Sequence, residues 1–290
     1  MERIKFTLIL IVFPALLFAQ TDSAKSKTDT IHVGNMTIIK RNDPGEKKQT
    51  TMQIGNGKNH EQSNVNTSDL ILDLGFANWT DKTDYAAATS QGYLVNKPGT
   101  TPLASNDLKL RSGKSTNVNL WFFMQRINLI KHYVNIKYGI GLEMHNYRFN
   151  SNLTFKEDGA NPYNPAQNIN HAFIFRDSVS FSKDKLAADY VTIPFMLNFR
   201  TNPNNSDKGL TFSAGVSIGY LYSSRNKEIS SERGKQKKHN DFDLEKWKFS
   251  YIAELGIGPV RLYGSYSPNS IFEQGFKLLP YNVGFRLSNW

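Results

Sequence analysis

The chain has 290 residues, a formal net charge of +10 and no cysteine. The lack of thiols excludes disulfides, cysteine catalysis, cysteine-ligated metals and a lipid-modified N-terminal cysteine. A basic chain of this kind can meet nucleic acid in principle, but anionic lipid phosphates or surface glycans are the expected partners at a cell surface, and a basic chain with no specific partner is the alternative.

Residues 1–19 have the pattern of an export signal. Arg3 and Lys5 precede a short apolar run that ends at Ala19. The run is shorter than the roughly 20 residues that a spanning helix needs, so cleavage after Ala19 is expected rather than an uncleaved anchor. An exported chain with no later apolar segment is either soluble outside the inner membrane or a closed barrel, because only helices and barrels satisfy their backbone polar groups in lipid.

Residues 20–68 are polar, with few aromatic side chains and no sustained helix or strand period. This composition predicts a largely disordered periplasmic tail. Within it, the β-branched residues of the stretch 30–40 predict a strand or hairpin. About fifty polar residues ahead of a barrel exceed what a simple start needs, so the tail is a candidate contact for another envelope protein.

From Asp69 onward, apolar residues recur at every second position, which is the strand period and places one apolar row on one face. In the segment 133–146, for example, Val134 and Ile136 alternate with Asn135 and Lys137. Comparable rows begin at Leu70, at Val118 (continuing through Leu120 and Phe122 to Met124), and at Val191, Leu210, Trp247 and Tyr281, whereas 260–267 is weak. The rows predict about eight strands, each with an apolar face and a polar face.

The connections between these strands alternate in length. Short links fall at 129–132, 202–208 and 257–259, and long polar links fall at 80–115, 150–188, 225–245 and 268–279. Short turns on one rim and long loops on the other are typical of outer-membrane barrels, with the short side facing the periplasm, whereas a soluble sandwich does not separate loop lengths in this way.

We therefore predict an all-β fold over 69–290, an antiparallel transmembrane up-and-down β-barrel of about eight strands. It is expected in the outer membrane of a Gram-negative-type bacterium, in contact with outer-membrane lipid. The N-terminal tail and the C-terminus are both expected in the periplasm. The stretch 172–181 either forms a hairpin above the membrane or extends neighbouring strands.

Four stretches resemble the PorT-like outer-membrane β-barrel family: DYVTIPFMLNFR, KGLTFSAGVSIGYLYSSRNK, WKFSYIAELGIGPVRLYGSYSPNSIF and PYNVGFRLSNW. The resemblance covers roughly 69–290 and implies the barrel fold. The name-giving members are linked to type IX secretion and gliding, so a part in an envelope secretion or gliding apparatus is an alternative function, although strand pattern transfers fold and not function.

Two residues depart from the pattern of such barrels. Pro194 removes a ladder donor in mid-strand, so a local bulge is expected there. Trp290 is aromatic but out of phase with the lipid-facing row, unless a bulge at Ser288–Asn289 restores the phase.

The polar face of the strands carries charges that the barrel interior must accommodate. Those expected to form a lumen polar network are Asp73, Lys137, Glu143, Arg200, Glu254, Arg261 and Arg286, alongside Asn119, Gln125 and Asn198. Unpaired charges in a narrow lumen would be costly, which predicts a paired polar plug that stabilises the barrel rather than a conducting pore. Strand register predicts three contacts: Glu254 with Arg261, Asp73 with Arg286, and Gln125 with Lys137.

The loop 225–248 contains more basic than acidic residues. It predicts contact with anionic surface glycolipid, and a solvated loop is the alternative. The candidate contact residues are Arg225, Lys227, Arg233, Lys235, Lys237 and Lys238. Aromatic residues near the outer strand ends, namely Trp79, Tyr147, Tyr222 and Trp247, predict an interfacial girdle rather than a base-stacking platform, so no nucleic-acid partner is indicated.

Catalysis at the outer rim is a further alternative. His145 is expected to point inward near the outer end of its strand, with Glu143 below it, and Ser90, Ser115, Ser223 and Ser224 are in or near the outer loops. No motif connects these residues, and phosphate loops, dinucleotide fingerprints and zinc spacings are absent from the sequence. We therefore expect a non-enzymatic protein with a structural or binding role, and assign no catalytic, cofactor-binding or metal-ligating residue.

Overall fold

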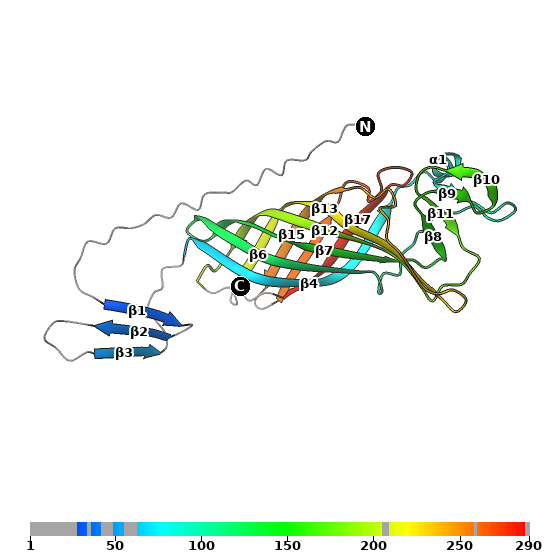
Figure 1. The fold of residues 1–290 in the computed structure, drawn as a ribbon. Coiled ribbons are helices and arrows are strands. Elements are labelled where there is room, and N and C mark those ends of the chain that lie inside the picture. The colour runs from blue at the N-terminus through cyan, green and yellow to red at the C-terminus, as the bar shows by residue number, and fades with distance from the viewer. Residues whose placement is uncertain are drawn as a thin grey trace, which may run out of the picture. The chain divides into compact units, whose positions relative to one another are not determined.

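The computed structural model describes residues 28–33, 36–41, 49–54, 63–204, 209–257 and 260–287 (Figure 1). The chain divides into two compact units, 1–61 and 62–290. The expected export signal and Trp290 lie outside the described residues.

The first unit contains a three-stranded antiparallel sheet. Its strands are β1 (Thr28–Val33), β2 (Met36–Arg41) and β3 (Gln49–Ile54), in the order β1-β2-β3. The strand or hairpin predicted at 30–40 is confirmed as the β1–β2 pair. The prediction that the rest of 20–68 is largely disordered is wrong for β3, whose Thr50, Thr51 and Ile54 are β-branched and favour extended backbone, and for the residues from Val65 onward, which already belong to the barrel.

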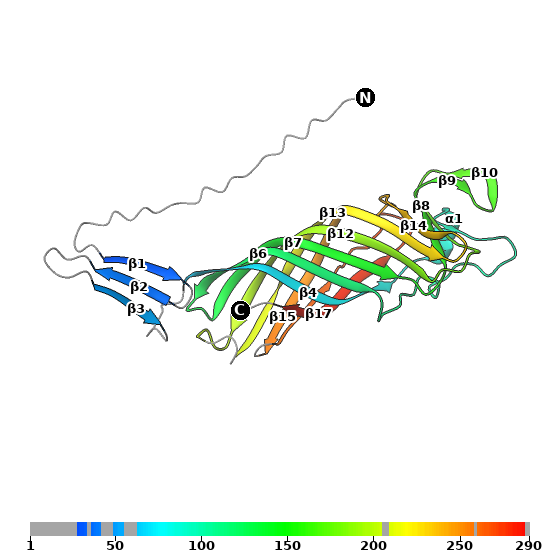
Figure 2. The ribbon, with the colours of Figure 1, turned by 60° about the horizontal axis from the view of Figure 1, so that its bottom comes forward.

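Eight strands of the second unit form a closed ring, as predicted. They are β4 (Val65–Asp81), β6 (Thr116–Ile130), β7 (Val134–Arg148), β12 (Lys183–Arg200), β13 (Leu210–Ser230), β15 (Trp247–Ile257), β16 (Val260–Tyr266) and β17 (Leu278–Leu287). Each strand pairs antiparallel with the next in the chain, and β17 pairs with β4 to close the ring (Figure 2). The fold is therefore an all-β, antiparallel up-and-down barrel.

The outer surface of the ring is apolar. On β12, Ile193, Phe195 and Leu197 are 50%, 53% and 44% exposed, whereas Thr192 and Met196 are 0% and 1% exposed. The predicted outward rows of β7, β13, β15 and β17 alternate in the same way. Soluble proteins rarely leave so large an apolar surface in water, so this surface suits hydrocarbon. Among the described residues, no helix is long and apolar enough to cross a membrane.

A β-bulge in β6 changes which side chains face the lumen. Trp121 pairs with Gly141, but Phe123 pairs with Ile140, so β6 contains one extra residue at this point. Phe122 and Phe123 are consequently both exposed to the outside. Gly141 leaves room for the inward indole, because a Cβ there would lie 2.7 Å from Cε3 of Trp121.

The bulge overturns two predictions beyond it. Met124, predicted in the lipid-facing row, is completely buried inside the barrel. Gln125, predicted in the lumen beside Lys137, instead pairs with Tyr138 and accepts a hydrogen bond from its hydroxyl. Arg126 takes the position opposite Lys137.

Pro194 does not cause the predicted bulge. The ladder to β13 continues through the pair Pro194–Ser217 without a register shift. On the β7 side, Thr192 and Phe195 keep a common register, and only the pairs at Ile193 and Pro194 are missing. The lost donor therefore leaves a gap in one ladder.

The predicted alternation of connection length is confirmed, and the long connections are folded. We call the rim with long connections the long-loop end and the other rim the short-turn end. The cap is defined as the long connections 82–115, 149–182, 231–246 and 267–277. It contains α1 (Tyr85–Ser90), β5 (Leu94–Val95), β8 (Leu153–Lys156), β9 (Gly159–Asn161), β10 (Asn164–Ile169), β11 (Phe173–Arg176) and β14 (Gly234–Lys238). These elements gather at one end of the barrel (Figures 1 and 2).

Part of the stretch 172–181 is the middle strand of a small sheet in the cap. β11 pairs parallel with β5 and antiparallel with β8. The stretch is therefore neither a hairpin by itself nor an extension of the barrel strands, and these two alternatives are both wrong.

An apolar core joins the cap to the long-loop end of the barrel. Trp79 and Tyr147, from β4 and β7, are buried in this core with their ring centroids 4.8 Å apart. Their prediction as girdle residues is wrong, because the cap covers them. Tyr222 and Trp247 remain 49% exposed on the outer surface, where girdle residues are expected. The cap thus closes the mouth of the barrel at this end.

Candidate functional site

The lumen contains a network of buried charges that crosses the barrel. Arg286 on β17 donates from Nε and Nη2 to the two carboxylate oxygens of Asp73 on β4, at 2.7 and 2.8 Å. It also contacts Glu254 on β15, which in turn pairs with Lys137 on β7. The predicted contact between Asp73 and Arg286 is therefore confirmed.

A second group of charges lies nearer the long-loop end. Glu143 forms an ion pair with Lys248, and His145 lies 3.6 Å from Glu143 and 3.1 Å from Nζ of Lys248. Lys248 is absent from the predicted lumen network, because the predicted loop 225–248 includes it. The signal was present, since Trp247 and Phe249 face outward and the residue between them must face inward.

The charges of these two groups balance, and the space around them is filled. The three carboxylates are Asp73, Glu143 and Glu254, and the three cations are Lys137, Lys248 and Arg286. The lumen cavities next to them have volumes of about 30 and 20 Å³, which is about the space for one water molecule. The lumen is therefore plugged by paired polar side chains.

Arg261 does not reach the partner predicted for it. It pairs with Gly256, whereas Glu254 is opposite Tyr263. The turn lies one residue later than assumed, between Ile257 and Val260, which shifts the register by two residues. Arg261 and Arg200 instead line the small cavity at the short-turn end of the lumen.

The residues considered for rim catalysis are not assembled. His145 is completely buried in the lumen, where its other ring nitrogen lies 3.4 Å from the amide of Asn117. Ser90, Ser115 and Ser224 hydrogen-bond to backbone carbonyls instead. Over the described ranges, no hydrogen bond joins His145 to any serine.

Basic side chains form a ladder across four neighbouring strands at the long-loop end. Arg148 on β7 is opposite Lys185 on β12, Lys185 is opposite Lys227 on β13, and Lys227 is opposite Lys237 on β14. We call these four residues the basic row. Each of them is partly or fully exposed on the outer face.

The basic row has further cations beside it and little negative charge on its own face. Lys183, Arg225 and Lys235 are its positively charged neighbours. Like charges at this spacing repel one another, so an anionic ligand would stabilise the row.

The six predicted glycolipid contacts do not all lie on this face. Lys227, Lys235 and Lys237 do. Arg225 is next to it but forms an ion pair with Asp189 at 2.5 Å. Arg233 and Lys238 pair with acidic residues on the inner side of the β13–β14 hairpin, Arg233 with Asp177 at 2.7 Å and Lys238 with Glu228 at 3.9 Å.

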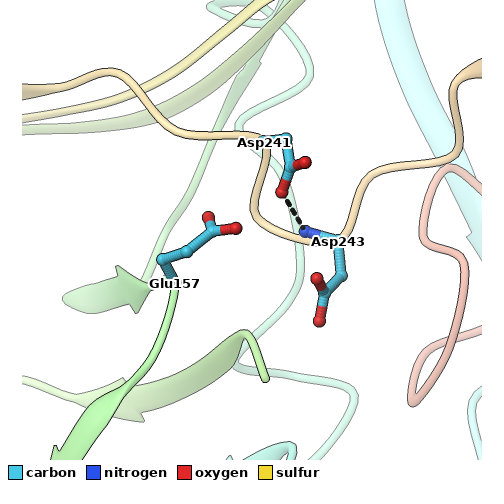
Figure 3. Close-up of side chains that lie close together, drawn as sticks. All are labelled: Glu157, Asp241 and Asp243. Atoms are coloured by element: carbon cyan, nitrogen blue, oxygen red, sulfur yellow. Dashed lines mark hydrogen bonds between the residues drawn. The ribbon is translucent and has the colours of Figure 1, made fainter. Parts of the chain in front are cut away.

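The cap contains a cluster of three acidic residues, Glu157, Asp241 and Asp243 (Figure 3). Ligand oxygens of the three lie within 4.8 Å of one another. The backbone amide of Phe242 donates to Glu157 at 2.7 Å, and that of Ala172 donates to Asp243 at 2.8 Å. These bonds tie the third long connection to the second. Oxygen ligands at such spacing are of the type that hard cations prefer, and these three are the residues that could hold one.

Comparison with known proteins supports the assignment made from this geometry. A family model described as the outer membrane protein beta-barrel domain matches residues 85–273. The chain belongs to this family. The matched range covers most of the cap and the strands from β6 to β16, while β4 and β17, which close the ring, lie outside it.

One solved structure similar to this outer-membrane barrel is the crystal structure of Ail, the attachment invasion locus protein of Yersinia pestis. It is 13% identical, the similarity covers 76% of this chain and 98% of that chain, and the TM-score is 0.29. None of the curated proteins matches the chain. The family supports the general barrel resemblance found in the sequence, and the narrower PorT-like resemblance stays a prediction.

The acidic cluster gives the cap of this outer-membrane barrel a pH dependence. Burial and the neighbouring Asp241 carboxylate raise the pKa of Glu157 from 4.5 to about 7. The folded cap therefore binds a proton between these two pH values that the open cap releases, so cap stability falls as the pH rises through this window. A pKa difference of one unit corresponds to about a tenfold change in the opening equilibrium of the cap. Because solvent screens the charges, we expect a change of about tenfold across this pH window.

Hydrogen exchange of the amides in 231–246, compared at pH 5 and pH 8 after correction for the intrinsic rate, measures this effect. The variant Glu157→Gln should remove most of the dependence, whereas Asp158→Asn at the exposed neighbouring position should keep it. Protection that increases with pH in the unmodified protein would show the sign to be wrong.

Proposed function

We propose that the protein is a non-conducting, non-enzymatic outer-membrane barrel that displays its folded cap at the cell surface and binds anionic glycolipid along the basic row. The observation that carries the proposal is the ladder of Arg148, Lys185, Lys227 and Lys237 on the outer face of adjacent strands. The plugged lumen supports a non-conducting role, and the burial of His145 supports a non-enzymatic one.

The height of the basic row suits lipid headgroups and the sugars above them. Tyr220 and Trp247 pack edge-to-face on the outer surface, with ring centroids 4.9 Å apart, where an interfacial girdle is expected. Lys227 is five residues beyond Tyr222 on β13, about 16 Å along an extended strand and less in height because such strands tilt. Phosphate groups of a surface glycolipid would lie within reach of long basic side chains at this level.

The lengths of the connections indicate how the barrel is oriented in the membrane. Long connections of outer-membrane barrels face the outside and short turns face the periplasm. β4 begins and β17 ends at the short-turn end. We infer that the start and the end of the barrel both face the periplasm.

A charge-reversal pair tests glycolipid binding. The protein is reconstituted in phosphatidylcholine vesicles with and without lipopolysaccharide, and the temperature at which the folded, faster-migrating gel band disappears is measured. Lipopolysaccharide should raise this temperature for the unmodified protein. In Lys227→Glu/Lys237→Glu the stabilisation should fall by at least the roughly 1 kcal/mol that each surface lysine contributes.

Lys82→Glu/Lys277→Glu is the matched control, because both lysines are exposed at the long-loop end but flank the β4–β17 pair on the other side of the ring. If lipopolysaccharide stabilised both double variants equally, this result would contradict the proposal. A changed envelope lipid profile in His145→Ala cells would contradict the non-enzymatic part.

The sheet of the first unit supports the proposal that the protein contacts another protein of the envelope. Its sheet has two edge strands, β1 and β3, and edge strands offer unpaired backbone groups to a strand of another protein. Affinity purification from intact envelopes, with the chain from Gln20 to Glu61 present or deleted, tests this contact. A secretion or gliding component that copurifies only with the full chain would support the PorT-like role, and identical copurification profiles would argue against a partner for this unit.

A further inference from the structure

The cap contains a cavity that the glycolipid proposal does not use. It has a volume of about 600 Å³ and is formed by residues 95–100, strands β8 and β11, the turn between β9 and β10, and strand β14. Its walls thus come from three of the four long connections. Pockets that bind small molecules typically have volumes of about 300–1,000 Å³, whereas the lumen cavities hold about one water molecule each.

The cavity is lined by five basic residues, Lys97, Lys156, Arg176, Arg233 and Lys238, and by one acidic residue, Asp177. Asp177 is saturated: its carboxylate accepts two hydrogen bonds from Arg233, one from the Thr154 hydroxyl and one from the Val179 amide. The negative charge of Asp177 is therefore neutralised by Arg233.

Two of the cavity lysines have no such partner. Arg176 pairs with Asp107 at 2.8 Å, and Lys238 lies 3.9 Å from Glu228. Lys97 and Lys156, in contrast, form no ion pair with any residue in the part of the chain that the structure describes. The unmatched positive charge of the cavity is therefore concentrated on these two side chains.

The remaining walls combine aromatic rings with small polar groups. Tyr163 and Phe175 pack edge-to-face with centroids 6.2 Å apart, and the hydroxyl of Tyr163 donates to the Arg176 carbonyl at 2.7 Å, which fixes the ring. Asn96, Thr100 and Ser178 also line the cavity. Aromatic faces with a few convergent polar groups suit a ligand that has both apolar faces and hydroxyls, as sugar rings have.

We propose that this cavity binds an acidic oligosaccharide, whose negative groups contact Lys97 and Lys156 and whose rings pack against Tyr163. The cavity is separate from the basic row. Arg233 and Lys238 belong to it, whereas Lys237 belongs to the row, and alternating side chains of a strand such as β14 point to opposite faces. The proposal therefore stands independently of glycolipid binding.

Calorimetric titration of the refolded full chain in detergent micelles with trigalacturonic acid tests the proposal. We expect saturable binding that weakens with added salt. Lys97→Glu/Lys156→Glu should weaken it at least tenfold, because two charged contacts are lost. Tyr163→Ala should weaken binding as well. Resistance of the cap to protease is measured for every variant, so that a binding loss is counted only where the cap remains folded.

Two controls separate this site from the basic row. Lys82→Glu/Lys277→Glu and Lys227→Glu/Lys237→Glu should both bind trigalacturonic acid as the unmodified protein does. Lipid-free acidic oligosaccharide from the cell's own outer membrane is used as a competitor. Competition would identify the cell's own glycan as the source of the ligand, and its failure would identify a foreign polysaccharide, and both results support an acidic sugar.

Three results would overturn the proposal. These are the absence of saturable binding, equal affinity for neutral maltotriose or for triglutamate, and unchanged affinity in Lys97→Glu/Lys156→Glu with a folded cap.

Discussion

Replacing the central arginine of the lumen, Arg286→Leu, is expected to destabilise the barrel by about 3–5 kcal/mol, the usual cost of breaking a buried ion pair. Arg286 contacts both Asp73 and Glu254. Without it, the two groups of paired charges would hold one excess negative charge beside cavities that admit about one water molecule. Urea unfolding in lipid vesicles, followed by tryptophan fluorescence, measures the loss.

A double variant identifies charge imbalance as the cause. Asp73→Asn/Arg286→Leu restores the balance, because Glu254 and Lys137 then remain as a pair. It should recover much of the stability lost in the single variant, since removing both partners of a buried pair is often close to neutral. A single variant within 1 kcal/mol of the unmodified protein, or a double variant no more stable than the single, would contradict the plugged-lumen account.

The second large effect is expected on the outer surface. Phe195 is at the centre of the apolar row of β12 and is 53% exposed. The substitution Phe195→Arg should cost about 2–4 kcal/mol in a bilayer, because a charged side chain at the midplane loses its hydration.

The same substitution near the rim provides the control. Leu210 begins β13 at the short-turn end and is 45% exposed. Leu210→Arg should cost only about 0–1 kcal/mol, since an arginine near the interface reaches water. The folded fraction in vesicles is compared across urea concentrations. Equal costs at the two positions would mean that Phe195 does not face hydrocarbon.

The barrel was predictable because successive side chains of each strand face lipid and the lumen in turn. Alternation fixes which side chains of β7, β12 and β13 face lipid, and loop length fixes the ends of the strands. The contact between Asp73 and Arg286 followed from closing the ring, which pairs the first strand with the last.

What the sequence did not reveal depends on single-residue insertions and turn positions. The bulge at Phe122 leaves no sign except three consecutive aromatic residues, Trp121 to Phe123, yet it moves Met124 inside and Gln125 away from Lys137. A one-residue error in the turn before Val260 likewise assigned Arg261 to the wrong partner.

The cap was hidden for a different reason. Its core residues, such as Leu103, Leu108 and Phe155, are scattered among polar residues without a period, so its loops were expected to be solvated. The basic row and the cavity both depend on how these connections pair and pack. Lys248, in contrast, could have been placed in the lumen in advance, because it lies between Trp247 and Phe249 of the predicted outward row.

The most direct test of the account is a label scan along residues 191–199 of β12. The chain has no cysteine, so a single cysteine can be introduced at each position and carry a nitroxide. In vesicles, labels at Ile193, Phe195 and Leu197 should be accessible to oxygen dissolved in the lipid and shielded from a water-soluble nickel complex, whereas labels at Thr192 and Met196 should be shielded from both. Access of the nickel complex to the outer row, or the loss of this two-residue period, would contradict a barrel whose apolar rows face hydrocarbon and whose charges are sealed inside.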